Sequence, residues 1–569
     1  MTGTTGAPQT GAYLTTELAE PPDLGLAEGG VLARATGTMT AFTGVSRLTG
    51  FARILVATGV LGTTALGNTY DTANSVPNIL FELFAAGALQ AVLIPTLVEL
   101  LDKGDDDEAR HVAGSVLGLT CGFLAVLGVM AAALAPLLAR GVFAGVQDPV
   151  TRHDQIQLGT IFLWFFIPQV IFYAAGMVAT AVLNARYRFA LPTIAPRANN
   201  LIVIASYLVF NAMRQGEQPS LHLTVPQILV LAGGTTLGVI VFCGLPVVAV
   251  IRSGFSLRPR FDRHHPAVRH VGRLGGWAAM QLATTQVLLI AILVLSNRID
   301  GGEIAYEAAF RFFLLPHALL TLPILTALFP ALSRRTHLDD WAGFTLRADQ
   351  GLRAILYFVA VASAALTALG PLLASTLIAG HVHNGGTQMI GRTIVAFGPG
   401  LLGYGLFLFA ARLQYARADT WTSAWVNVGV VVLGILGMVV MADLVHSSLE
   451  VPGLAAVHSA VYTLGAVVLL AITWRRFPRA HRPRLGVALR SSLIPAVLAG
   501  VVMAVIARLD TWDGRVRGLV GLVVAGGTGL AVYLVLSIAL GGPRPGALVR
   551  MVRGTELPSG ELDVDSRPR

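Results

Sequence analysis

Charged residues are scarce in this sequence, which argues against a soluble globular protein. They make up 12% of the 569 residues, whereas soluble domains carry about 25%. Apolar runs of about 20 residues recur between residues 38 and 541, and each is long enough to cross a bilayer core of about 30 Å as a helix. The runs are continuous rather than alternating, which excludes a β-barrel. We therefore predict an all-α polytopic membrane protein.

Other features are missing as well. The first 30 residues lack a basic segment followed by a compact apolar one, so we predict a disordered tail rather than a cleaved signal. The two cysteines, Cys121 and Cys243, are isolated within apolar runs and indicate no redox compartment. No Gly-rich phosphate loop is present, and the two histidines of "HVH" at 381–383 are too few for a metal site. We predict no enzyme, no metal and no cofactor.

The apolar runs predict fourteen spans in two six-helix lobes plus two C-terminal helices. The spans are 38–62, 70–101, 112–140, 158–184, 191–212, 225–251, 272–297, 305–332, 351–378, 391–412, 421–442, 453–474, 487–508 and 517–541. The corresponding domains are a disordered cytoplasmic tail at 1–37, an N-terminal lobe at 38–251, a basic cytoplasmic linker at 252–271, a C-terminal lobe at 272–474, two extra helices at 475–541 and a cytoplasmic tail at 542–569.

Basic residues predict the orientation of these spans. Lys103 is the sole lysine, so the net charge of +9 comes from arginine. Loops that follow even-numbered spans hold twenty-one basic residues, against seven in the loops that follow odd-numbered spans. The positive-inside rule places the even loops and both termini in the cytoplasm. The excess arginine is therefore explained by topology and anionic membrane lipids, and we predict no nucleic-acid partner.

Two pairs of short motifs suggest an internal repeat. "RLTGFA" at 47–52 matches "RLGGWA" at 273–278, and "IPTL" at 94–97 matches "FPAL" at 329–332. The pairs fall in spans one and seven, then in spans two and eight. Because six spans separate the members of each pair, both copies enter the membrane from the same side. This favours a parallel repeat of two lobes around an axis along the membrane normal.

Several charged residues lie inside predicted spans, where insertion costs roughly 2.5–3.5 kcal/mol each. They are Arg47 and Arg53 in the first span, Glu82 in the second, and Glu307 and Arg311 in the eighth. For Arg47 a structural reading stays open, because a long side chain near the span's start reaches the surface. Glu307 and Arg311 are four residues apart and can neutralise each other. Glu82 is either a counter-ion for Arg53 or an ion-coupling carboxylate.

Buried arginines suit one class of ligand particularly well. A guanidinium binds phosphate oxygens in bidentate fashion and stays charged at any working pH. Arginines around a hydrated cavity would therefore bind a diphosphate, such as the headgroup of a diphosphate-linked lipid whose tail remains in the bilayer.

At these residues the sequence resembles the MurJ/MviN-type lipid II flippases. "SRLTGFAR" at 46–53 and "VPNILFELFAAGALQAVLIPTLVEL" at 76–100 resemble their opening signature. "FRFFLLPHALLTLPILTALFPALSR" at 310–334 resembles their eighth-span signature. The resemblance implies the fold of the multidrug/oligosaccharidyl-lipid/polysaccharide flippase superfamily. Two lobes would enclose a cationic cavity, and spans 13 and 14 would form a groove for the lipid tail.

The resemblance also implies a function. Lipid II would be taken from the inner leaflet of the bacterial plasma membrane and delivered outward by alternating access for peptidoglycan biosynthesis and cell-wall biogenesis. Ser46, Arg47, Arg53 and Arg311 stand where the family has polar and basic cavity residues and are the predicted substrate-binding residues. The driving force would be the membrane potential or a monovalent ion, and cell-wall synthesis proteins are candidate partners.

The sequence departs from the family pattern in the second span. Phe81 and Glu82 replace an arginine pair, and Asn68 replaces a common aspartate, although Asp71 follows three residues later. Either another arginine, such as Arg197, compensates, or the substrate differs. Asp71, Glu82 and Glu307 are the predicted ion-coupling or counter-ion residues. Three alternatives remain: an exporter of another polyprenyl-diphosphate saccharide, a cation-coupled multidrug antiporter, and a non-transporting cell-wall scaffold.

Overall fold

A computed structural model describes residues 46–542, apart from 84–86, 187, 189, 379, 381, 383–384, 446, 478–484, 510–511 and 513. All regular structure in this part of the chain is helical, which confirms the predicted all-α class. The predicted tails, apart from Gly542, and both histidines of the "HVH" motif lie outside the described residues.

Eleven helices are long and apolar enough to cross a membrane, and they coincide with eleven of the predicted spans. Predicted spans 38–62, 70–101 and 272–297 correspond to the helix at 46–61, to α2 (Ala65–Phe81) with α3 (Gly87–Asp102), and to α11 (Pro266–Ser296). The chain is thus a multi-pass membrane protein.

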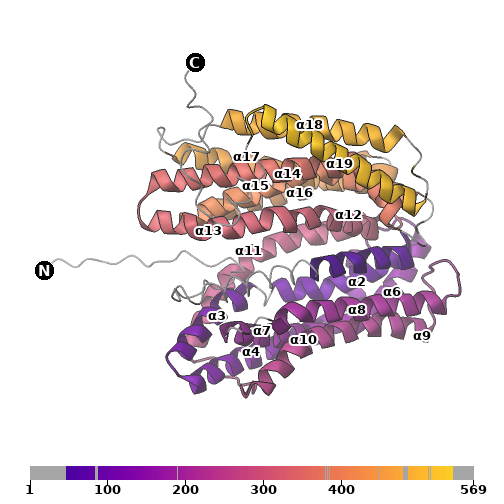
Figure 1. Ribbon diagram of the computed structural model, residues 1–569. Helices are drawn as coiled ribbons and strands as arrows, with labels where there is room; N and C mark the ends of the chain where they lie inside the picture. The colour runs from indigo at the N-terminus through magenta and orange to yellow at the C-terminus, as the bar shows by residue number, and fades with distance from the viewer. Residues whose placement is uncertain are drawn as a thin grey trace.

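The first lobe lies on one side of the molecule, below the second in Figure 1. Within it, α10 packs on α7 and α8, α7 packs on α4, and α6 packs on α2. Its remaining elements are α4 (Asp106–Ala133), α5 (Ala135–Val142), α6 (Pro149–Phe166), α7 (Gln169–Ala185), α8 (Ala190–Met213), α9 (Val225–Ile228), the π-helix η2 (Leu229–Gly233) and α10 (Gly234–Arg252).

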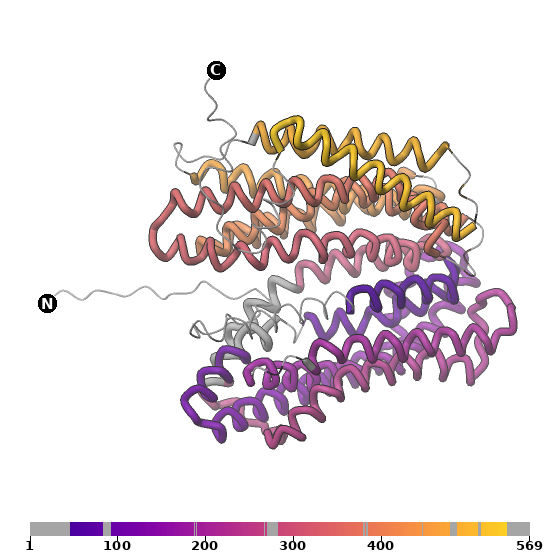
Figure 2. Tube along the Cα trace, in the orientation of Figure 1, coloured from indigo at the N-terminus to yellow at the C-terminus, as the bar shows by residue number. Residues whose placement is uncertain are grey.

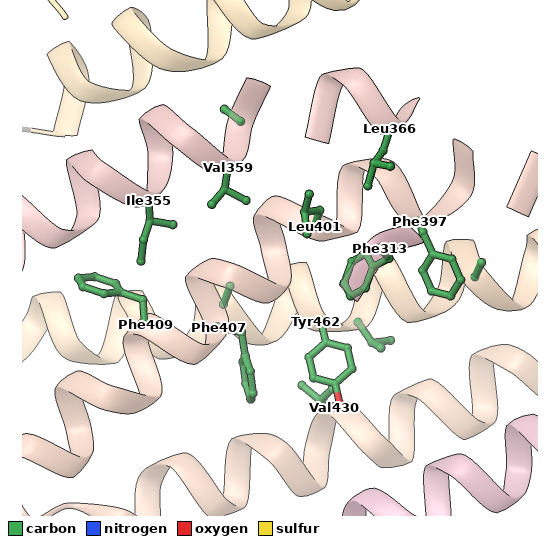
Figure 3. Packing of buried hydrophobic residues seen from close by; sticks show 14 of the residues in the cluster. Phe313, Ile355, Val359, Leu366, Phe397, Leu401, Phe407, Phe409, Val430 and Tyr462 are labelled. Carbon is green, nitrogen blue, oxygen red and sulfur yellow. The ribbon is translucent and has the colours of Figure 1, made fainter. Parts of the chain in front are cut away.

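The second lobe is built around α15, which packs on both α14 and α17. Figure 3 shows its apolar core, with Phe313, Phe397 and Leu401 between these helices. Its elements after α11 are α12 (Gly302–Pro316), the π-helix η3 (His317–Thr321), α13 (Leu322–His337), α14 (Trp341–Leu377), α15 (Gly386–Ala416), α16 (Thr420–Leu444) and α17 (Ser447–Arg476).

Two further helices, α18 (Leu485–Leu509) and α19 (Arg515–Ala539), lie on the outer side of the second lobe, at the top of Figure 2. Both pack on α14. The hydroxyl of the buried Tyr533 donates a hydrogen bond to the carbonyl oxygen of Tyr357 at 2.6 Å, which fixes α19 to α14.

The eighth predicted span is one interrupted helix. The α-helical hydrogen-bond pattern ends at Pro316, because proline has no backbone N–H to donate. The π-turn η3 follows, and α13 continues the helix after it. π-Turns inside helices frequently mark functional sites. This one begins six residues after Arg311 and one residue after Pro316.

The connection between the lobes is attached to the first lobe. The backbone N–H of Arg260 donates to the carbonyl oxygen of Gly114 in α4 at 2.9 Å, and His265 Nε2 lies 2.6 Å from Glu108 Oε1. A hydrogen bond from His111, together with backbone N–H groups of the connection, lowers the pKa of Asp262. Because α11 begins at Pro266, the last six residues of the predicted linker are helical.

Candidate functional site

The helix at 46–61 carries the first two predicted binding residues. Ser46 is half-buried, and Arg47 is exposed. The charge of Arg47 acts on His317 in η3 of the second lobe. Phe51 packs edge-on against Phe312 of α12, with ring centroids 4.8 Å apart. This helix of the first lobe therefore faces the interrupted eighth span of the second lobe.

Arg53 lies deeper, among hydroxyl groups of the first lobe. Its guanidinium interacts with Tyr207 of α8 and with Tyr70 of α2. These two tyrosines are themselves hydrogen-bonded at 3.0 Å and buried. The tyrosine oxygens offer dipoles but no fixed negative charge, so the positive charge of Arg53 is not neutralised by them.

Arg311 lies on the second lobe and has a carboxylate partner on its own helix. Its Nε donates to Glu307 Oε1 at 2.6 Å. The Arg311 side chain remains 46% exposed, whereas that of Glu307 is 20% exposed. The spacing of four residues thus produces the pairing considered from the sequence, and much of the guanidinium stays accessible to a ligand.

Asp71 connects the two arginines. It is half-buried on α2, and the charges of Glu307, Arg311 and Arg53 all act on it. Since α2 packs against α12, the charges that act on Asp71 come from both lobes. Asp71 is thus within electrostatic reach of two guanidinium groups and of the Glu307 carboxylate.

Glu82 and Arg197, two other charged residues considered from the sequence, lie at the end of α2 and in α8, respectively. Glu82 is exposed and accepts a hydrogen bond from the amide of Gln286 in α11, so it links the two lobes. Arg197 is half-buried in α8, one turn before Asn200, whose Nδ2 donates to Thr49 Oγ1 at 3.2 Å. Arg197 therefore comes from a helix that contacts the one bearing Arg47 and Arg53.

Hydrogen bonds that sequence reasoning missed close one end of the lobe interface. Asn68 Nδ2 donates to the carbonyl oxygen of Ile299 at 2.9 Å, and Asn68 Oδ1 accepts the backbone N–H of Glu303 at 2.9 Å. Nearby, Asn297 Nδ2 donates to Thr72 Oγ1 at 2.8 Å. The sequence did contain a signal for these bonds, because Asn68 replaces the aspartate that is common in the family. An amide can both donate and accept a hydrogen bond, whereas an ionised carboxylate can only accept.

Glycines bring the backbones together at the same end. A Cβ on Gly67 would lie 3.0 Å from Ile304 Cδ1 of the second lobe. A Cβ on Gly386 would overlap Thr63 Oγ1 and would lie 2.8 Å from Thr63 Cβ. Gly301 has a φ of +71° and touches the backbone of Thr63. The segments at 59–68 and 297–304, together with Gly380 and Gly386, therefore form a tight closure between the lobes.

A cavity of about 550 Å³ lies beside this closure and is lined by none of the predicted site residues. Arg298 pairs there with Asp443 at 2.9 Å and with Glu450 at 3.2 Å. Arg298, the arginine that lines this cavity, is thus already paired with two carboxylates of the second lobe.

These features define a class of protein. Two helical lobes meet tightly at one end, and arginines from both lobes gather with carboxylates between them. This is the architecture of a polytopic membrane transporter.

The chain belongs to the lipid II flippase MurJ family, whose family model matches residues 57–517. It is 26% identical over 523 residues to a probable lipid II flippase MurJ of Vibrio cholerae, covering 88% of this chain and 95% of that protein. It is 28% identical over 426 residues to the lipid II flippase MurJ of Burkholderia cenocepacia, covering 74% of this chain and 80% of that protein. The resemblance inferred from the sequence motifs is confirmed.

Solved structures show the same fold. The inward closed conformation of a lipid II flippase MurJ superposes with a TM-score of 0.69 at 20% identity, covering 88% of this chain and 98% of that one. A multidrug resistance MATE family transporter in an inward-facing conformation gives 0.64 at 10% identity, with 76% and 94% covered.

Proposed function

We propose that this protein is a lipid II flippase, which moves lipid II from the inner to the outer leaflet of the bacterial plasma membrane by alternating access. The observation that supports the proposal is the packing of the two arginine-bearing helices: Phe51, two residues before Arg53, lies edge-on against Phe312, which follows Arg311, with ring centroids 4.8 Å apart. Guanidinium groups on both lobes bind the two phosphates of one headgroup. The lobes then change their relative position around that headgroup. The protein is a transporter rather than a catalyst.

The positive-inside rule assigns the two ends of the lobe interface. The closure around Thr63, Gly301 and Gly386 lies in connections that follow odd-numbered predicted spans, so it faces outward. The conformation in Figure 1 is therefore closed to the outside. Arg47, at the start of the first helix and exposed, belongs to the opposite end. It meets the incoming headgroup first, and Arg53 and Arg311 hold it next.

The lipid tail stays outside the lobes, along α18 and α19. Val497, Val501 and Val505 form an exposed apolar row on α18, spaced four residues apart. A row of this kind accommodates a polyprenyl chain by dispersion contacts while the headgroup crosses between the lobes. The net negative charge of the headgroup makes outward movement favourable under an inside-negative potential, at about 2.3 kcal/mol per charge per 100 mV.

Complementation of a flippase-depleted strain tests the proposal. Arg53→Ala or Arg311→Ala should abolish growth at normal protein levels. Arg335→Ala is the matched control, because Arg335 pairs with Asp340 at the end of α13 and away from the lobe interface. Full growth of a strain that carries both Arg53→Ala and Arg311→Ala would reject the site and would favour a non-transporting scaffold.

A further inference from the structure

The guanidinium of Arg53 differs from that of Arg311 in the groups that hold it. Arg311 is paired with the Glu307 carboxylate, whereas, in the part of the chain that the structure describes, no carboxylate forms an ion pair with Arg53. Arg53 is half-buried and hydrogen-bonds the hydroxyl group of Tyr207 on α8. A half-buried cation without a paired anion needs another source of orientation, and the hydroxyl groups behind Tyr207 supply it.

A continuous row of hydroxyl groups leads away from Arg53, formed by Tyr207, Tyr70 and Thr235. The Tyr207 hydroxyl lies 3.0 Å from that of Tyr70, and the Tyr70 hydroxyl contacts Thr235 Oγ1. Thr235 Oγ1 lies 2.8 Å from the backbone carbonyl oxygen of Leu231, in the π-helix η2. The three side chains of this hydroxyl row are each at most 2% exposed, so bulk water does not complete their hydrogen bonds.

Both ends of the hydroxyl row impose the same direction on its hydrogen bonds. A guanidinium can only donate, so the Tyr207 oxygen accepts from Arg53, and its hydrogen is donated to Tyr70. Tyr70 donates to Thr235, and Thr235 donates its single hydrogen to the carbonyl oxygen of Leu231, which can only accept. Every hydroxyl group of the row therefore turns an oxygen lone pair toward Arg53 and its hydrogen away from it.

Packing keeps the hydroxyl row in place. The Tyr70 ring lies edge-on to the buried rings of Phe162 and Phe166 in α6, with centroid distances of 5.8 and 5.7 Å. Ser206 of α8 donates a hydrogen bond to the carbonyl oxygen of Val230 in η2. The two elements that carry the ends of the row, α8 and η2, are thus bound to each other.

We propose that the hydroxyl row positions Arg53: it holds the guanidinium in place for a phosphate group without neutralising its positive charge. This inference rests on the proposed flippase function, in which that phosphate belongs to the lipid headgroup. A carboxylate would also orient Arg53, but it would compete with the phosphate for the same cation. The contact with Tyr207 uses only part of the five donors of a guanidinium, and Nε has no hydrogen-bond partner. Donors therefore remain for a bidentate contact with phosphate oxygens.

The far end of the row offers a specific perturbation. Thr235→Val keeps the shape of the side chain, but Tyr70 loses its acceptor and can then donate only to Tyr207. The Tyr207 hydrogen has to turn toward the guanidinium, which cannot accept it. Arg53 thus loses its acceptor and its fixed orientation, although the substituted residue is two tyrosines away along the row.

The test measures binding of labelled lipid II to the full-length protein in detergent. Thr235→Val should raise the dissociation constant about tenfold, which corresponds to about 1.4 kcal/mol. Thr235→Ser removes a methyl group but keeps the hydroxyl, and it should restore the wild-type affinity. Thr160→Val is the matched control, because Thr160 is also buried and donates to a carbonyl oxygen one turn earlier, that of Ile156, but lies outside the row.

A double-mutant cycle with Arg53→Ala shows whether Thr235 acts through the arginine. Thr235→Val should weaken binding in the wild-type background and have no further effect in Arg53→Ala. An equal loss in both backgrounds, or a loss in Thr235→Ser as large as in Thr235→Val, would show that Thr235 acts through packing and would overturn the proposal. Tyr70→Phe interrupts the row at a second point and should also raise the dissociation constant about tenfold.

The outcomes separate positioning from the flippase function. A wild-type protein that binds no lipid II overturns both. A wild-type protein that binds lipid II, with the same affinity in Thr235→Val and Tyr70→Phe, overturns the positioning role and leaves the flippase function standing. These two variants alter different helices, so a folding defect in one of them leaves the other as the measurement.

Discussion

The outer closure depends on the absence of a side chain at Gly386. This residue begins α15 with helical backbone geometry, so alanine is tolerated locally, but its Cβ would overlap the side chain of Thr63 across the lobe interface. Overpacking of this kind costs about 1–3 kcal/mol. Because a tenfold change in an equilibrium corresponds to about 1.4 kcal/mol, Gly386→Ala should lower the closed-to-open ratio about 5- to 140-fold.

The closed-to-open ratio can be measured through the substitution Ile304→Cys. Ile304 is 4% exposed and packs on Gly67 of the other lobe, so a membrane-impermeant maleimide added outside should label it only in the open state. The background carries Cys121→Ala and Cys243→Ala, since both native cysteines are free thiols. Labelling should accelerate in Gly386→Ala and return to its original rate when Thr63→Gly is added. Unchanged labelling in Gly386→Ala would refute the assignment of this contact to an outer gate.

Three further results are expected. Asn68→Asp places a carboxylate oxygen where an amide N–H donates to a carbonyl, so it should weaken the closure by about 1–3 kcal/mol and raise the same maleimide labelling; protection from labelling would contradict this. Asp262→Asn should speed hydrogen exchange at the backbone N–H of His265, which the carboxylate accepts at 3.2 Å. Hydrogen bonds from His111 and from backbone N–H groups lower the pKa of Asp262. The hydrogen bonds to its carboxylate are therefore intact above the ordinary carboxyl pKa and are lost only as the pH falls through the lowered value. In the wild-type protein, exchange at His265, corrected for its intrinsic pH dependence, should not change between pH 5 and 8. Tyr533→Phe removes the bond to the Tyr357 carbonyl and should lower stability by about 1 kcal/mol in thermal unfolding, without changing lipid II specificity.

Hydropathy predicted the helical spans because membrane thickness imposes a length on every apolar run. Eleven helices of the described chain match predicted spans to within ten residues at each end. The start of the eighth span was placed at residue 305, whereas α12 begins at Gly302. "DGGE" has the composition of a turn, and Gly301 does adopt a left-handed φ of +71°. Glu303 lies outside the predicted span, and its burial was not predicted.

The candidate site was only partly predictable. A charge inside an apolar run is visible in the sequence, so Arg53, Glu307 and Arg311 could be named as candidate residues. Their partners depend on tertiary packing: Arg53 interacts with Tyr70 and Tyr207 from helices far apart in the chain. The spacing of four residues did predict the contact between Glu307 and Arg311, because it is local to one helix.

The most direct measurement is the leaflet accessibility of lipid II in cells whose single flippase is this protein. With wild-type protein, newly made lipid II should become accessible at the outer surface, and with Arg53→Ala or Arg311→Ala it should accumulate on the inner leaflet while Arg335→Ala behaves as wild type. Equal outer accessibility in wild type and both interface variants would contradict the account.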